Sequence, residues 1–260
     1  MGASFDITYV YQFIPKLLSC LGTTLFIVAA SIVLGVVIGF LIALPRLYKV
    51  PVLQRLSQVY VSFFRGTPIL IQLFLIYYGL PEVLKYLQVD VSRAPVLLFV
   101  ILAYALNSGA FISEAIRAAV TAVDRGQVEA AYSVGMTGYQ AFSRIVLPQA
   151  LAVSVPVFAN IVIANLKDTS LAFSLGVMEL TGKAETLGAA TQHFIETYIS
   201  LAGVYFVISM TLEKLFVRLE RRLMRHEHSI TDSVKRQRGA VFSYRGLATR
   251  LGFGKGGTGA

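Results

Sequence analysis

The chain has 260 residues, of which 56% are hydrophobic and only 14% are charged, and its mean hydropathy is +0.69. Soluble domains carry about 25% charged residues, so this composition argues against a water-soluble protein and predicts one embedded in lipid. The single cysteine, Cys20, excludes an intramolecular disulfide and a multi-cysteine zinc site, and the three histidines are not at metal-site spacing. We therefore expect no metal site in this chain.

The net charge of +9 raises the question of a nucleic-acid partner. The positive charge is concentrated at one end, because 11 of the 23 Lys and Arg residues lie from Lys214 onward, at the end of the last apolar run and beyond it. A basic tail of this kind fits the anionic surface of a cytoplasmic membrane leaflet better than a nucleic-acid groove. We expect a lipid membrane, and no nucleic acid, as its partner.

Five apolar segments reach the roughly 20 residues that a transmembrane helix needs. They predict an all-α membrane protein with spans over residues 17–44, 52–80, 94–120, 147–166 and 198–217. The first contains Gly35 and Gly39, a small-residue pair that allows close contact between helices. In the second, residues 65–68 (Arg-Gly-Thr-Pro) predict a break whose freed carbonyl groups must be satisfied inside the protein. The short apolar segment 169–177 either is re-entrant or extends the fourth span.

The distribution of Lys and Arg predicts the orientation of these spans. The loop after span one carries Arg46, Lys49 and Arg55, and the loop after span three carries Arg117, Arg125 and Arg144. The tail is strongly basic, and the other two loops mix both signs. The N-terminus is therefore expected outside and the C-terminus in the cytoplasm. This divides the chain into an external segment 1–16, a transmembrane domain 17–222, and a basic tail 223–260 that we expect to be disordered.

A polar insert separates spans three and four, on the expected cytoplasmic side. Asp124 is a candidate N-cap, with Gln127 three residues later as in a variant capping box, and Glu129 is placed in the first turn. These signals predict a helix over about residues 127–139. One apolar face is indicated by the helical spacing of Val128, Ala131, Tyr132 and Met136. A chain reversal is indicated by Gly135 and Gly138. Such a helix either lies on the lipid headgroups or docks against a partner.

The spacing within this insert resembles the EAA coupling motif of ABC importer permeases. The residues at its specified positions are Glu129, Ala130, Ala131, Gly135, Ile145, Leu147 and Pro148. Further segments resemble the polar amino-acid branch of that family, whose members carry histidine, glutamine, arginine or cystine. They are Thr23-Thr24, Phe64 to Pro68, Asn107-Ser108, Glu114 to Arg117, Gly126-Gln127 and Lys167 to Leu171.

The resemblance implies a type I ABC importer permease fold in a multi-pass protein of the bacterial inner, or cytoplasmic, membrane. It implies a coupling helix that docks on an ATP-binding subunit, an extracytoplasmic binding protein that delivers the substrate, and a second permease subunit, identical or homologous. The substrate would be a polar amino acid, with L-cystine one candidate. ATP and magnesium would be bound by the partner subunit, because this chain has no nucleotide-binding motif of its own and is not expected to be an enzyme.

Polar residues at membrane depth are candidates for the substrate path. They are Asn107, Glu114, Asn160 and Asn165. Each also has a structural interpretation: the asparagines can bond neighbouring helices, and Glu114 can pair with Arg117 three residues later. Lys167 and Asp168, at the end of span four, are expected to pair with each other rather than clamp a substrate.

Two other functions remain compatible with a polytopic membrane protein. An ion-coupled secondary amino-acid transporter needs intramembrane carboxylates or an inverted repeat. Apart from Glu213 near the end of the fifth span, Glu114 is the one carboxylate within the expected spans, and five spans do not divide into two equal halves. A structural membrane subunit without a transport role is the third alternative.

Overall fold

The computed structural model describes residues 4–91 and 93–223, and within these every regular element is a helix. The chain divides into two units, residues 1–216 and 217–260, and the elements below belong to the first except for the end of the last helix. The α-helices are α1 (Ile7–Leu18), α2 (Leu21–Leu47), α3 (Pro51–Gly66), α4 (Ile69–Phe74), α5 (Leu80–Tyr86), α6 (Val96–Thr121), α7 (Arg125–Ser133), α8 (Gly138–Ala141), α9 (Leu147–Asp168), α10 (Leu180–Thr191) and α11 (Phe194–Leu223). Two π-helical segments, η1 (Leu75–Gly79) and η2 (Phe142–Val146), and a 3₁₀ segment, η3 (Thr169–Leu175), join consecutive α-helices.

Five helical runs in the described chain are long and apolar enough to cross a membrane. They are Leu21–Leu47, Ile69–Tyr86, Val96–Thr121, Gly138–Leu175 and Phe194–Arg222. Their exposed faces carry large apolar side chains, such as Phe40 on α2 and Phe206 on α11. Exposed apolar surface of this extent is stable in lipid rather than in water. The predicted all-α membrane fold is confirmed.

The first two predicted spans differ in detail from the structure. Residues 7–18 form a separate helix, α1, so the first span begins at Leu21, and it runs through Pro45 to Leu47 instead of ending before that proline. The predicted break in span two is present, but it divides residues 52–80 into two helices: the chain is extended at Thr67 and Pro68. The run that is long enough to span begins only at Ile69, and it continues to Tyr86.

The fourth span is longer than its apolar core. Helical structure is continuous from Gly138 to Leu175, so segment 169–177 begins as an extension of the span and not as a re-entrant loop. Its end is set by Gly176, whose φ of 80° lies in the left-handed region that glycine adopts without strain. Span three matches its prediction within two residues, and α11 begins four residues before the predicted fifth span.

The most extensive contact between described helices is that of α2 with α6. A methyl group built on Gly39 would lie 2.9 Å from the carbonyl oxygen of Gly109, and one on Gly35 would lie 3.3 Å from that of Ala105. The backbones approach this closely because neither glycine has a side chain, as the Gly35–Gly39 pair predicted. This seam places the middle of α6 where α3, α4 and α9 also contact it.

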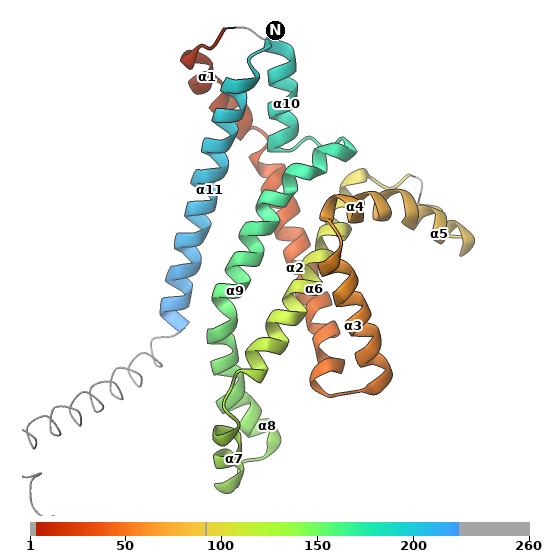
Figure 1. The fold of residues 1–260 in the computed structure, drawn as a ribbon, viewed down its shortest axis with the longest axis vertical. Helices are drawn as coiled ribbons and strands as arrows, with labels where there is room; N and C mark the ends of the chain where they lie inside the picture. Colours follow the sequence, from red (N-terminus) through yellow and green to blue (C-terminus); the bar gives the residue numbers. More distant parts are fainter. Residues whose placement is uncertain (1–3, 92, 224–260) are drawn as a thin grey trace, which may run out of the picture. The chain divides into compact units, whose positions relative to one another are not determined.

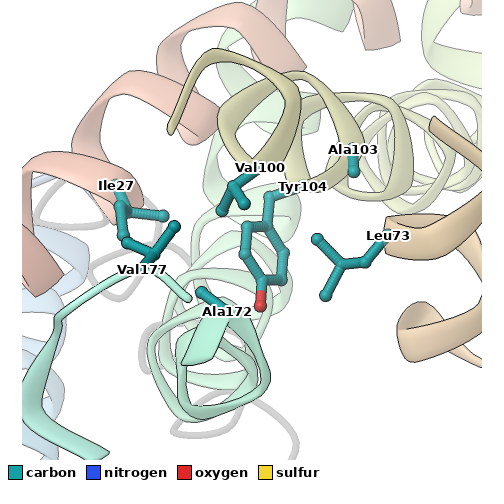
Figure 2. Packing of buried hydrophobic residues seen from close by; sticks show 7 residues of the cluster. All are labelled: Ile27, Leu73, Val100, Ala103, Tyr104, Ala172 and Val177. Carbon is teal, nitrogen blue, oxygen red and sulfur yellow. The ribbon is translucent and has the colours of Figure 1, made fainter. Parts of the chain in front are cut away.

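A buried cluster joins α2, α4, α6 and the end of span four. It comprises Ile27, Leu73, Val100, Ala103, Tyr104, Ala172 and Val177. Figure 2 shows the Tyr104 ring at its centre, between Leu73 on one side and Ala172 on the other. The Tyr104 hydroxyl donates a hydrogen bond of 2.6 Å to the carbonyl oxygen of Asp168, which satisfies both groups at the junction of α9 and η3. The cluster therefore fixes the end of span four against α6.

Within the first unit, helix α1 lies at the end far from α7 and α8 (Figure 1). Its N-cap, Asp6, accepts from the backbone N–H of Thr8. Hydrogen bonds from the side chain and then the backbone of Thr8 lower the pKa of the Asp6 carboxyl. The backbone N–H of Asp6 in turn donates to the buried Glu196 carboxylate of α11 at 2.8 Å. Ser200 adds a second bond, from its hydroxyl to the carbonyl oxygen of Val10. Two hydrogen bonds between residues that are distant in the sequence therefore hold α1 against α11.

Candidate functional site

The polar insert folds into two short helices, α7 and α8, at one end of the group of spans (Figure 1). Asp124 caps α7 as predicted, because its carboxylate accepts from the backbone N–H of Gly126 at 2.8 Å. The helix runs from 125 to 133, so the predicted range 127–139 is wrong at both ends. Glu129 lies in the second turn and not in the first. Gly135, with φ of 81°, reverses the chain between the two helices.

The predicted Asp124–Gln127 capping box is wrong. The side chain of Gln127 accepts instead from Nε2 of Gln149, at 2.6 Å. A complete capping box starts the next helix: the backbone N–H of Thr137 donates to the Gln140 side chain, and that of Gln140 donates to the Thr137 hydroxyl. The insert is therefore built as two separately capped helices joined by a turn.

The EAA-like residues divide into an outer and an inner set. Glu129 and Ala130 are exposed, whereas Ala131 is 5% exposed and packs inward. The Glu129 carboxylate has no hydrogen bond or ion pair with any residue that the structure describes. Two tyrosines of the α7–α8 insert, Tyr132 and Tyr139, are also exposed. Tyrosine is enriched at protein–protein interfaces, so the two exposed tyrosines are the part of this surface typical of a partner contact.

The second half of the motif lies where α8 passes into span four. Ile145 is in η2, and Leu147 and Pro148 open α9. A hollow of about 300 Å³ lies between this segment, α7 and the end of α6. Val128 and Tyr132 of α7 line it, together with Phe142 of η2. The hollow therefore separates α7 from the start of the fourth span, and Ile145, Leu147 and Pro148 are not among its lining residues.

Three of the four residues predicted for the substrate path lie together in mid-span. Asn107, Asn160 and Asn165 line one hollow of about 290 Å³ between α6 and α9, with Asp168 at the end of α9 also in its wall. Glu114 is not among its lining residues. Both of its carboxylate oxygens are taken by arginines: Arg117 on its own helix, as expected, and Arg46 of α2 at 2.7 Å. The Arg46 contact joins two spans and was not predicted.

The three asparagines of the hollow are held differently. Asn165 is 4% exposed and bonds in both directions, since it donates to Ser108 at 2.8 Å and accepts from Ser31 at 3.2 Å. Asn107 donates to the side chain of Gln72 at 2.9 Å and to the Phe64 carbonyl. Asn160 is exposed and makes no hydrogen bond within the described chain. Asn160 is thus the asparagine of the hollow that is free to bind a ligand.

Gln72 was missed by the sequence analysis. Its side chain is 1% exposed and donates to the carbonyl oxygens of Phe64 and Thr67, the groups freed by the break between α3 and α4. At the same break, the Arg65 guanidinium lies over the Phe111 ring, 5.5 Å from its centroid. An isolated amide within the apolar run 69–74 was the available signal, because a polar group at that depth needs partners.

Lys167 and Asp168 do not form the predicted pair. The ion pairs among the described residues do not include them, and Lys167 is exposed while Asp168 is partly covered and faces the hollow. Adjacent residues on a helix point about 100° apart, which separates their side chains. The predicted tail 223–260 lies outside the described residues except for Leu223.

The chain is similar to known proteins along most of its length. Residues 31–225 match the family described as binding-protein-dependent transport system inner membrane component. The L-cystine transport system permease protein TcyL of Bacillus subtilis (strain 168) is 44% identical over 230 residues, 88% of this chain and 96% of that protein. The probable amino-acid ABC transporter permease protein PatM of Vibrio harveyi is 40% identical over 220 residues, 84% of this chain and 96% of that protein.

A solved structure gives the same result for the fold. A chain from a crystal structure of an amino acid ABC transporter with histidines superimposes with a TM-score of 0.75 at 34% identity, covering 85% of this chain and 100% of that one. The fold is thus that of a type I ABC importer permease, with five candidate spans, α7 between the third and the fourth, and α8 as the first turn of the fourth. The chain belongs to the family of binding-protein-dependent transport system inner membrane components.

Proposed function

We propose that this chain is the membrane-spanning permease subunit of an ATP-driven importer of polar amino acids. The observation that carries the proposal is the α7–α8 insert, which presents an unpaired Glu129 carboxylate and an exposed Ala130 at the spacing of the EAA motif. Family membership and the amino-acid transport names of its relatives support it. The same evidence favours ATP-driven import over an ion-coupled transporter or a structural subunit.

The orientation follows from charge. Arg46, Arg117 and Arg125 lie toward the same side as α7, and the basic residues from Lys214 onward lie at the end of the last span and beyond it. With basic residues facing the cytoplasm, residues 1–16 are outside, the domain 17–222 spans the bacterial inner or cytoplasmic membrane, and residues 223–260 are inside. The α7–α8 insert is then cytoplasmic, where an ATP-binding subunit is available.

The partners have separate tasks. An ATP-binding subunit receives α7 and binds ATP and magnesium, so this chain moves substrate but does not hydrolyse nucleotide. A second permease subunit completes the path across the membrane. An extracytoplasmic binding protein delivers the amino acid at the opposite face, where α10 and the residues near α5 carry mixed charges.

The mid-span hollow is the proposed part of the substrate path within this chain. Asn160 offers an unbonded amide, and Asp168 offers a carboxylate that attracts an ammonium group. Asn107 and Asn165 are bonded to neighbouring helices, so they shape the hollow more than they bind within it. Glu114 was expected either on the substrate path or in a structural ion pair. Because two arginines bond its carboxylate, we assign it the structural role. L-Cystine is the leading substrate, because TcyL is named for it.

Reversal of the charge at Glu129 tests the coupling role. We expect Glu129→Lys to abolish ATP-driven uptake, because a lysine replaces an exposed carboxylate at the centre of the partner surface. The measurement is uptake of radiolabelled L-cystine and ATP hydrolysis in proteoliposomes that contain the complete transporter.

The control is Glu129→Gln, which keeps the size of the side chain and should retain more uptake than the lysine variant. Full uptake by a well-folded Glu129→Lys protein contradicts the proposal. Collapse of the proton gradient separates ATP-driven from ion-coupled transport, since ATP-driven uptake persists while ATP is supplied.

A further inference from the structure

Two glutamines that lie outside the motif spacing connect the coupling helix directly to span four. Gln149, in the first turn of α9, donates through Nε2 to Oε1 of Gln127 on α7 at 2.6 Å. The same Nε2 donates to the carbonyl oxygen of Ile145 at 2.9 Å. A primary amide has two N–H groups, so both are used here.

The bond to Ile145 determines where the other N–H points. Ile145 lies one helical turn before Gln149, so this bond holds the amide against its own helix. The second N–H then points away from the helix, toward Gln127. Gln149 is partly covered, and Gln127 is exposed. Gln149 is therefore the residue held in place, and Gln127 accepts its hydrogen bond.

The Gln127–Gln149 hydrogen bond joins α7 and α9 across the irregular π-helical segment η2. In η2 the N–H of Leu147 bonds to the carbonyl oxygen of Phe142, five residues back, instead of four. Pro148 follows and has no N–H, so the carbonyl of Arg144 lacks its ordinary α-helical donor. A π-turn next to a proline has fewer regular hydrogen bonds than a continuous α-helix and bends more easily.

We infer that the Gln127–Gln149 hydrogen bond is a transmission link, and that Gln149 is a positioning residue that makes α9 follow α7. A displacement of α7 that reached span four only through η2 would be absorbed there as bending. The side-chain bond bypasses η2, because its two ends lie on α7 and on α9. The inference rests on the proposed coupling of α7 to an ATP-binding subunit.

Variants of Gln127 test the link with little risk to folding, since this side chain is exposed. Gln127→Leu and Gln127→Lys remove the acceptor and differ in charge, whereas Gln127→Glu keeps an acceptor for Gln149. We measure L-cystine taken up per ATP hydrolysed by the complete transporter in proteoliposomes. The first two variants should lower this ratio about three- to tenfold, as expected for one lost hydrogen bond, and Gln127→Glu should stay within about twofold of wild type.

Gln149→Leu and its double variant with Gln127→Leu complete the cycle. If the two glutamines act through one bond, the double variant is no worse than Gln149→Leu. Gln58→Leu is the matched control, because Gln58 on α3 is exposed and has no hydrogen bond in the described chain; it should keep the wild-type ratio.

The outcomes separate this inference from the proposed function. A wild-type ratio in Gln127→Leu and Gln127→Lys overturns the link. If Glu129→Lys loses uptake in the same assay, the coupling role of α7 still stands; if it too transports normally, both proposals fail. A loss in Gln127→Lys alone also overturns the link, because it reports charge and not the missing bond.

Discussion

The α7–α8 insert and the mid-span hollow are both polar, yet they are held together in opposite ways. In the insert, Asp124 bonds a backbone group two residues away and Thr137 bonds Gln140 three residues away. In the hollow, Asn165 bonds Ser108 across 57 positions and Ser31 across 134. Local bonds depend on a short run of sequence, whereas the second kind depends on which helices pack together.

The difference has a consequence for function. The insert is exposed and keeps Glu129 unpaired, so its polar groups are available to another protein. The hollow uses most of its amides to join helices and leaves Asn160 and Asp168 for a ligand. Polar residues at membrane depth therefore include both structural and ligand-facing groups, and their hydrogen bonds distinguish them.

Replacement of two asparagines of the hollow gives the largest expected contrast. Asn165→Leu should lower the free energy of unfolding by about 1–3 kcal/mol, because Ser108 and Ser31 lose a buried partner. Asn160→Leu should leave stability unchanged and reduce uptake, because its amide bonds no described residue. The measurements are the unfolding midpoint of the purified protein in detergent and L-cystine uptake in proteoliposomes.

Equal loss of stability in both variants would show that the distinction between bonded and free amides is wrong. Asn160→Gln is the control for the transport effect, since it retains an amide in the hollow and should recover part of the uptake.

Removal of the α7 cap tests the opposite, local kind of stabilisation. Asp124→Ala should destabilise α7 by about 1 kcal/mol, because the N–H of Gly126 loses its acceptor. The effect should be confined to the insert, which hydrogen exchange of the α7 amides measures directly. Ser133→Ala, at the other end of α7, is the comparison variant. Faster exchange throughout the spans would mean that the insert is not locally stabilised.

Glu179 combines both kinds of contact and gives the smallest expected effect. It is fully buried, caps α10 by accepting from Gly182, and accepts from Tyr205 of α11. Burial is the main cause that raises the pKa of the Glu179 carboxyl above its ordinary value of 4.5. The folded state then holds the proton more tightly than the unfolded state, so stability should fall as pH rises from 4.5 through the raised pKa.

The corresponding variant is Glu179→Gln, which keeps an acceptor for Gly182 but cannot ionise. Its unfolding midpoint should lose this part of the pH dependence and lie slightly above wild type at neutral pH. The check is the midpoint of both proteins across pH 4 to 8, a range set around the ordinary carboxyl pKa. A steeper fall with pH in the variant would show that Glu179 is not the group responsible.

Several predictions succeeded because they depended on neighbours in sequence. The Gly35–Gly39 pair, the break near Pro68, the Asp124 cap and the reversal at Gly135 are all present. Other predictions failed where a side chain could bond either a partner near in the sequence or a distant one. Gln127 bonds Gln149 and not the start of its own helix, and Lys167 and Asp168 form no ion pair with each other.

The sequence alone determined the lipid setting, the number of spans and the position of the α7–α8 insert, because hydropathy, helical period and capping act over a few residues. Only the tertiary structure decided that Arg46 reaches Glu114, that Gln72 closes the break after α3, and that Gln149 ties span four to α7. Those contacts arise when packing brings helices together, and a single polar residue in an apolar run shows that it needs a partner without showing which one.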